Sequence, residues 1–114
     1  MTNQPEVFLD HILTSINALE EYTTGVSENR FYTERKLQMA AIKELEIIGE
    51  AVRNLPPEFK EKYPSVPWKD IAGMRSFLIH EYFDIDLDLV WDTIQSKIPE
   101  LKQDVEKIIK ENNF

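Results

Sequence analysis

The 114-residue sequence contains no cysteine and only three glycines. Without cysteine there is no disulfide framework, no thiolate metal site and no thiol nucleophile, and a cytoplasmic location fits best. The few glycines, together with six prolines that fall between periodic stretches, predict few breaks in the chain. We therefore expect long structural elements, which favours helices.

Long apolar stretches are also missing. The N-terminus, Met1 to Glu6, has no basic segment followed by an apolar one, and no window approaches the ~18 uninterrupted apolar residues of a membrane-spanning helix. We expect neither a signal peptide nor a membrane span. With 42% hydrophobic residues, the chain has the length and composition of one domain with its own core, assigned here to residues 1–114.

Basic side chains are in the minority. The 13 basic residues stand against 21 acidic ones, for a formal net charge of -8, the opposite of what a protein that grips a long phosphate backbone usually has. The charge still permits a small site in which a few cations position one phosphate. It would also suit acidic faces that meet a basic protein partner. The charge therefore limits any nucleic-acid contact to a small site and leaves the function open.

Apolar residues at helical spacing predict two helices in the first half of the chain. One stripe ends near Gly25 and predicts a helix over residues 5–24. Its members are Phe8, Ile12, Ile16, Leu19 and Tyr22. A second stripe, with Ser27 as its candidate N-cap, predicts the longest helix, which Pro56 and Pro57 forbid from continuing. Its members are Leu37, Ala41, Leu45, Ile48, Val52 and Leu55.

A third helix follows a connector over residues 56–66, which holds one short turn around residues 59–63. Pro67 is well placed in the first turn of this helix, which continues to Phe83. Its expected core residues are Trp68, Ile71, Met74, Leu78 and Phe83.

The last part of the chain has two more helical patterns. Asp84 or Asp86 can cap a fourth helix, and Pro99 begins a last one. Their inward residues are Leu87, Val90, Trp91, Ile94, Leu101, Val105 and Ile108. Short connections between long amphipathic helices predict an all-α fold: an antiparallel bundle of four main helices plus a short or broken fifth.

Three polar residues of the third helix, Arg75, His80 and Tyr82, are candidates for chemistry. In a helix Arg75 and Tyr82 share a face, whereas His80 lies about 140° around the axis from Arg75 at ~100° per residue. Two arrangements reconcile them: the long Arg75 side chain reaches around the helix, or a two-fold dimer brings Arg75 of one chain towards His80 of the other.

These residue types suit cleavage of an RNA phosphodiester without a metal ion. An imidazole can take the proton of a 2′-hydroxyl or give one to the leaving oxygen near neutral pH, and a guanidinium can bind phosphate oxygens and offset transition-state charge. The Tyr82 hydroxyl can orient the substrate or the imidazole. On the residue types alone, however, surface or structurally satisfied side chains remain the commoner interpretation.

The segment from Gly73 to Asp86, Gly-Met-Arg-Ser-Phe-Leu-Ile-His-Glu-Tyr-Phe-Asp-Ile-Asp, resembles the Arg-x4-His-x-Tyr signature of HepT-like proteins of the HEPN superfamily. The resemblance extends over about residues 5–108. Other matching segments, in the same order, are Arg35-Lys36, Leu45 to Val52, Pro67 to Ile71, and Trp91.

This resemblance implies a helical-bundle homodimer that acts as a toxin of a HEPN/MNT toxin–antitoxin system, a metal-independent endoribonuclease without a cofactor. Arg75 and His80 match the family's catalytic pair. Tyr82 matches the tyrosine that some MNT-type nucleotidyltransferase antitoxins modify to O-AMP-tyrosine. Where HEPN RNases commonly have a polar residue, often Asn, this chain has Ser76, which shortens the reach of that supporting group. The antitoxin is the implied protein partner, with a larger complex of dimers and antitoxins as an open possibility.

A different function class stays open beside the RNase. The same dimeric bundle can be a non-catalytic interaction module that binds, or is AMP-modified by, a nucleotidyltransferase, with Arg75 and His80 binding nucleotide or phosphate. Ser76 and the net charge of -8 favour this module, and the Arg-x4-His pair favours the enzyme.

Other polar residues have structural interpretations. Helix capping and a solvated face explain the acidic run Glu81, Asp84, Asp86 and Asp88, so we assign no metal site. His11 should be exposed. Gly49 costs ~1 kcal/mol relative to Ala inside a helix, so we expect a helix–helix or dimer contact there. Four cations either extend a basic rim around the cleft or are solvated: Arg35, Lys36, Arg53 and Lys69.

Overall fold

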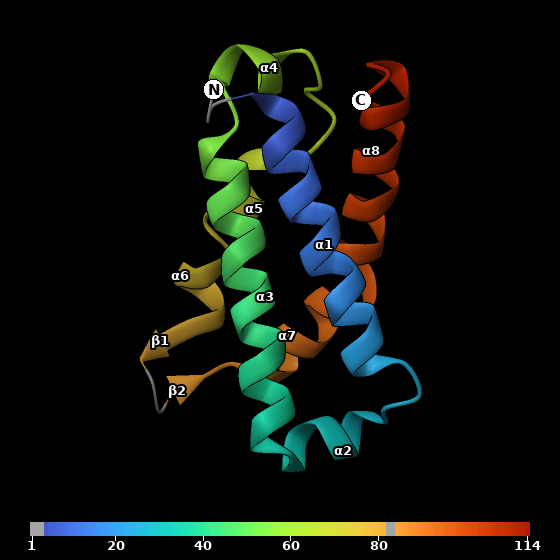
Figure 1. Cartoon of the computed structure of the whole chain (residues 1–114). Helices are drawn as coiled ribbons and strands as arrows, with labels where there is room; N and C mark the ends of the chain where they lie inside the picture. The colour runs from blue at the N-terminus through green and yellow to red at the C-terminus, as the bar shows by residue number, and fades with distance from the viewer. Residues whose placement is uncertain (1–3, 82–83) are drawn as a thin grey trace.

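Three long helices lie side by side and form the body of the protein (Figure 1). The computed structural model describes residues 4–81 and 84–114. Helix α1 (Pro5–Thr23) runs downward in the view of Figure 1, whereas α3 (Arg35–Asn54) and α8 (Ile98–Glu111) run upward beside it. The all-α class and the antiparallel arrangement are thereby confirmed. No helix among the described residues is both long enough and apolar enough to cross a membrane.

The predicted first helix, residues 5–24, agrees with α1 to within one residue at its end. Gly25 follows with a φ of 76°, a left-handed conformation that glycine adopts without strain. The buried stripe is centred one position away from the expected one: Leu9 is fully buried, while Phe8 lies at its edge and Tyr22 is exposed. The Tyr22 hydroxyl instead donates to the Glu44 carboxylate of α3.

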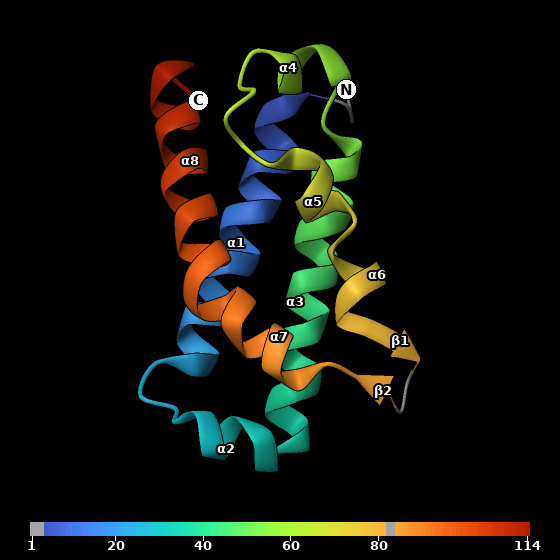
Figure 2. The ribbon, with the colours of Figure 1, turned by 180° about the vertical axis from the view of Figure 1, so that it is seen from behind.

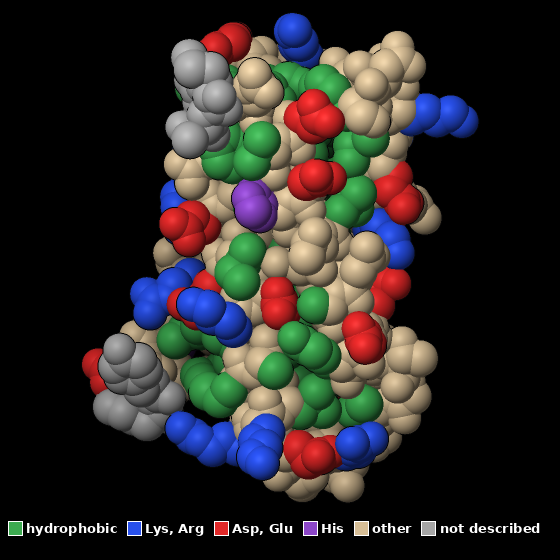
Figure 3. Space-filling model, in the orientation of Figure 1, with side chains coloured by type: hydrophobic (Ala, Val, Ile, Leu, Met, Phe, Trp, Pro, Cys, Tyr) green, Lys and Arg blue, Asp and Glu red, His purple; other side chains and the backbone are tan. Residues whose placement is uncertain are grey.

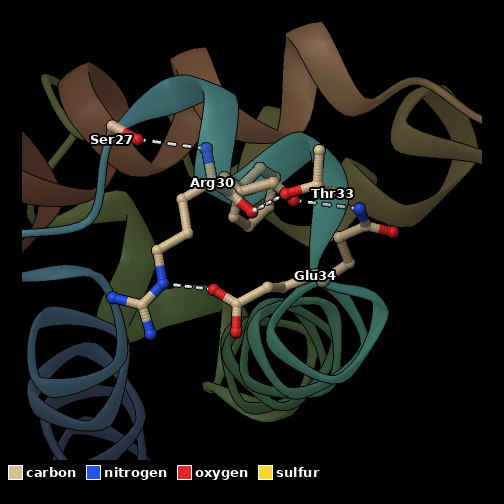
Figure 4. A network of polar contacts seen from close by, with 6 residues as sticks. Ser27, Arg30, Thr33 and Glu34 are labelled. Carbon is tan, nitrogen blue, oxygen red and sulfur yellow. Dashed lines mark hydrogen bonds and ion pairs between the residues drawn. The ribbon is translucent and has the colours of Figure 1, made fainter.

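The predicted second helix is broken once. Ser27 is its N-cap as expected, since its hydroxyl accepts a hydrogen bond from the backbone N–H of Arg30 at 3.1 Å (Figure 4). The first segment, α2 (Glu28–Thr33), ends at Glu34, which has an extended backbone and whose carboxylate pairs with Arg30. The apolar stripe predicted from Leu37 onward belongs to α3, the longest helix.

The connector after α3 contains the expected short turn as α4 (Pro57–Glu61). Trp68 begins the next segment and is buried, and its indole N–H donates to the Tyr63 carbonyl at 3.1 Å. Trp91 is half-buried, with its ring 5.1 Å from that of Phe31. Trp68 is thus a core anchor as predicted, and Trp91 packs at the core's edge.

The predicted third helix, from Pro67 to Phe83, is wrong as a single helix. The chain forms α5 (Trp68–Ala72), a break at Gly73, α6 (Met74–Leu78) and strand β1 (Ile79–Glu81), which pairs antiparallel with β2 (Asp84–Ile85). Ile79 pairs with Ile85, and the Leu78 carbonyl accepts from the Asp86 N–H at 2.9 Å. β-Branched residues favour such half-buried extended positions, which explains why the helix ends at Leu78.

The fourth and last helices form one continuous path. Asp86 caps α7 (Leu87–Asp92), as one of the two predicted choices, by accepting from the Leu89 N–H at 3.1 Å. A π-helical turn, Thr93–Lys97, then leads into α8 (Figure 2). Pro99 lies in the first turn of α8, as predicted, but no break separates α8 from the turn before it. Because proline clashes with the carbonyl four residues before it, the wider turn ahead of Pro99 lets the helix continue.

Candidate functional site

The site region begins with a close approach between α3 and α5. A Cβ at Gly49 would lie 3.2 Å from the Ile71 carbonyl oxygen, so only glycine fits this contact without a shift of the backbone. Arg53 reinforces it, because its Nη1 donates to the Ala72 carbonyl at 2.7 Å. The helix–helix contact expected at Gly49 is therefore present within the chain, and it positions the start of α6 beside α3.

Arg75 lies on α6 with an exposed side chain directed at α3. Its Nε donates to the Glu46 carboxylate at 2.7 Å, in an ion pair whose two side chains are 61% and 33% exposed. Such an exposed pair contributes only about 0.2–1 kcal/mol. Glu46 therefore orients the guanidinium through Nε–H, and the largely exposed side chain leaves Arg75 other N–H donors that solvent can reach.

A surface hollow of about 170 Å³ lies beside this pair, between α3 and the α5–α6 segment. We call it the α3–α6 hollow. Its charged lining residues are Lys43, Glu46, Glu50, Arg53 and Arg75. Three cations thus face two carboxylates in a protein whose net charge is -8. Lys and Arg side chains gather at the edge of the molecule where α3 and α6 lie side by side (Figure 3).

The other predicted site residues lie further along the segment. Ser76 is exposed on α6, and its backbone N–H donates to the Gly73 carbonyl at 3.0 Å. His80 is exposed in the middle of β1. Tyr82 falls outside the described residues, so its predicted roles stay predictions.

The turn from α6 into β1 corrects the expected geometry of the pair. Arg75 and His80 do not share one helix, so the 140° separation expected for them does not apply. Arg75 lines the α3–α6 hollow, whereas His80 does not. The protomer places both side chains in solvent on one short segment, but it brings only Arg75 to the hollow.

The acidic run mostly has the structural roles expected for it. Asp86 caps α7, and Asp88 accepts from the Tyr32 hydroxyl, which joins α2 to α7. The hydrogen bond to Asp88, followed by partial desolvation and the bond to Glu28, raises the pKa of Tyr32 well above its ordinary value. Within residues 4–81 and 84–114, no three His, Asp or Glu side chains are grouped so as to hold a metal ion.

Three charged residues of the hollow were missed in the sequence interpretation: Lys43, Glu46 and Glu50. The signal was present, because these residues share one face of α3 with Gly49 and Arg53 at spacings of three and four. A glycine in the middle of a charged helix face indicates that another backbone approaches there. Of the four cations considered as a basic rim, Arg53 lines the same hollow as Arg75.

The sequence of this chain is similar to those of known proteins. The model of the family described as "Ribonuclease HepT-like" matches residues 12–108. A protein of Caldanaerobacter subterraneus subsp. tengcongensis, provisionally named an RNase, is 48% identical over 93% of this chain and 95% of its own length. The "Probable ribonuclease HepT" of Thermococcus cleftensis is 42% identical over 90% of this chain and 94% of its own.

A further relative is a longer protein. A Methanocaldococcus jannaschii protein named as a gamma-glutamylcyclotransferase and, provisionally, an RNase is 48% identical over 97% of this chain, which spans 50% of that relative's length. No solved structure shows significant similarity to the chain. With a family match over most of its residues and relatives that align nearly end to end, this chain belongs to the HepT-like ribonuclease family.

Proposed function

We propose that this protein is the toxin of a HEPN/MNT toxin–antitoxin pair, a metal-independent endoribonuclease whose catalytic residues are Arg75 and His80. The observation that carries the proposal is the position of these two side chains. Both are exposed on the short segment α6–β1, and Arg75 pairs with Glu46 through Nε. Membership of a ribonuclease family supplies the substrate class.

The chemistry follows from the two functional groups. His80 accepts the proton of an RNA 2′-hydroxyl, whose oxygen attacks the neighbouring phosphorus while the bond to the 5′-oxygen breaks. The departing 5′-oxygen takes a proton from an imidazolium or from water. The Arg75 guanidinium donates to the non-bridging oxygens, where charge builds in the transition state. The products are a 2′,3′-cyclic phosphate and a 5′-hydroxyl.

A two-fold dimer would complete the site. Arg75 lies against α3 and His80 lies beyond the turn into β1, so a cleft that uses Arg75 of one protomer and His80 of the other satisfies both positions. A composite cleft also suits a protein whose overall charge is -8, because it doubles the local number of cations at the one place where phosphate must bind.

Control by the partner is the remaining part of the proposal. An MNT-type nucleotidyltransferase would attach AMP to Tyr82, two residues after His80. The added phosphate would compete for the donors of Arg75, and the nucleotide's bulk would fill the cleft. Intact-mass measurement after co-expression checks this step, since AMP-sized mass increases should be absent from the Tyr82→Phe protein.

Cleavage in EDTA is the direct test. The purified protein should cleave tRNA or mRNA, and His80→Ala and Arg75→Ala should each lower the rate while the helical content stays the same. Loss of general acid–base catalysis alone should cost ~10²–10⁴-fold. Equal rates for all three proteins would assign the activity to another site. No cleavage together with binding to the nucleotidyltransferase would favour the interaction module.

A further inference from the structure

A concentration of cations singles out the α3–α6 hollow. Lys43, Arg53 and Arg75 line it, and only Glu46 and Glu50 offset them among its charged lining residues. Its charge is therefore opposite in sign to that of the whole chain, which carries -8. A local excess of positive charge on an acidic protein attracts anions to that place and leaves the remaining surface repulsive.

We propose that the α3–α6 hollow is a second phosphate subsite for RNA, in which Arg53 and Lys43 bind a backbone phosphate next to the one that is cleaved. The proposal rests on the proposed RNase function, because it assigns Arg75 to both the reacting phosphate and the border of the hollow. Arg53 and Lys43 are then substrate-positioning residues, and they take no part in the bond-breaking step.

The geometry of Arg53 fits such a role. Its Nη1 donates to the Ala72 carbonyl at 2.7 Å, which fixes the side chain across the hollow. A guanidinium has five N–H donors, so one anchored group leaves others for phosphate oxygens, and the fixed stem reduces the entropy lost on binding. Arg75 is held in the same manner by one donor, through Nε to Glu46.

The size and openness of the hollow are also suitable. About 170 Å³ is far more than the ~10–15 Å³ that a single water needs, and the lining is as much polar as apolar in character. Gly49 lines the hollow at the close contact between α3 and α5, where a Cβ would lie 3.2 Å from the Ile71 carbonyl oxygen. A larger residue at this position would intrude on both the helix contact and the hollow.

Removal of a carboxylate from the hollow should have the opposite effect on RNA binding to removal of a cation. Glu50 is exposed and lines the same hollow, so it should repel a phosphate that Arg53 attracts. In a hollow that binds phosphate, removal of the Arg53 charge weakens RNA binding and removal of the Glu50 charge strengthens it. A merely structural Arg53 would give no such pair of effects.

The experiment measures binding of a 2′-O-methyl RNA oligonucleotide, which cannot be cut by attack of a 2′-hydroxyl, at several salt concentrations. Each phosphate contact on a single strand contributes about 0.7 to the slope of log K against log salt. We expect Arg53→Gln and Lys43→Gln each to reduce the slope by up to about this amount. In cleavage assays both should raise KM and leave kcat unchanged.

Arg30→Gln is the matched control. It removes the same charge from an exposed arginine that does not line the hollow: Arg30 lies on α2, where it pairs with Glu34 (Figure 4). If Arg53→Gln and Arg30→Gln have equal slopes, or if the unmodified protein shows no salt-dependent binding, the subsite is wrong. Lys43→Gln is a second test in case the Arg53 variant does not fold, because the Lys43 side chain makes no hydrogen bond or ion pair within the described residues.

The two proposals fail separately. Binding with the expected slopes but without cleavage would keep the subsite and reject the RNase. Cleavage that depends on Arg75 and His80, with no change for Arg53→Gln, would keep the RNase and reject the subsite.

Discussion

Arg75 belongs to the segment that resembles the family signature, and it forms an ion pair with Glu46, which is distant in the sequence. The two residues lie on α6 and α3, and their atoms Nε and Oε2 are 2.7 Å apart. Because the pair uses Nε–H, Arg75 keeps the N–H donors of its two Nη groups for a further acceptor. In the proposed site, Glu46 would fix the direction in which Arg75 meets a phosphate.

The first prediction concerns this orientation. Glu46→Gln keeps the shape of the side chain but removes the charge-assisted bond, so kcat for RNA cleavage should fall by at most about five-fold, the equivalent of ~1 kcal/mol for an exposed pair. Binding of the 2′-O-methyl oligonucleotide should not weaken, because a negative charge has left the hollow. Steady-state kinetics and anisotropy titrations measure the two effects.

Glu34→Gln is the control for that change. Glu34, between α2 and α3, pairs with Arg30 of α2 through the same two atoms, Nε and Oε2. Its substitution should leave kcat and binding unaltered. A Glu46→Gln protein that binds the oligonucleotide more weakly would contradict the orienting role.

Gly49 supports a second prediction, on stability. Gly49→Ala gains ~1 kcal/mol of helix propensity but forces a Cβ to 3.2 Å from the Ile71 carbonyl, and overpacking of this kind costs about 1–3 kcal/mol. We expect the free energy of unfolding in urea to fall, by up to about 2 kcal/mol. Gly73→Ala is the comparison, since its Cβ would lie at an ordinary 3.4 Å from the Lys69 carbonyl. Equal stability of the two variants would show that the backbone of α5 shifts at little energetic cost to accommodate a Cβ at position 49.

At the scale of the elements, hydrophobic periodicity predicted the existence of the long helices but not every break. The stripes of α1, α3 and α8 were sufficient because each helix buries one face along its whole length. The segment after Leu78 could not be assigned in the same way. The stripe from Trp68 to Leu78 fits a helix, whereas the β-branched Ile79 and Ile85 fit a hairpin, and tertiary contacts of the backbone decide where one ends and the other begins.

The same limit applies to the candidate site. Arg75, Ser76 and His80 were singled out because one segment resembles the family's signature, whereas Glu46 and Lys43 come from a helix that packs against that segment. Local spacing identifies residues that share a face of α3. It does not reveal which other element that face meets, because that depends on how the chain folds back at α5.

A third prediction tests how α2 is held against α7. The Tyr32 hydroxyl donates to Asp88, and this bond raises the pKa of the phenol above its ordinary value of about 10. Because the folded state retains the proton more strongly, the contribution to stability is complete below pH ~10 and is lost as the pH rises towards the folded-state pKa. The difference in Tm between the unmodified protein and Tyr32→Phe should therefore be constant at pH 7–9 and shrink above pH ~10.

Asp88→Asn provides the counterpart for Tyr32. It removes the first cause of the shifted pKa while leaving the tyrosine in place. The variant should lose most of the pH-dependent part of the stability. A Tm difference for Tyr32→Phe that stays constant up to pH 11 would mean that the hydroxyl does not hold α2.

At the scale of the whole molecule, the net charge of -8 opposes RNA binding, whereas cations outnumber carboxylates among the lining residues of the α3–α6 hollow. Within one protomer, Arg75 of α6 lines the hollow, whereas His80 lies on β1 and does not line it. If two protomers share each site, then neither the charge nor the catalytic pair of one chain is sufficient by itself. Association and activity become coupled.

The last prediction tests this coupling by mixing two inactive proteins. In a shared cleft, a dimer of one Arg75→Ala chain and one His80→Ala chain contains one site with both side chains intact and one site with neither. Random exchange makes about half of the dimers mixed, so co-refolding should recover about a quarter of the unmodified rate, whereas each variant alone stays inactive. Sedimentation at the assay concentration must show dimers. If mixing recovers no activity although mixed dimers form, then Arg75 and His80 act within a single protomer, and the hairpin must bring His80 back to the hollow.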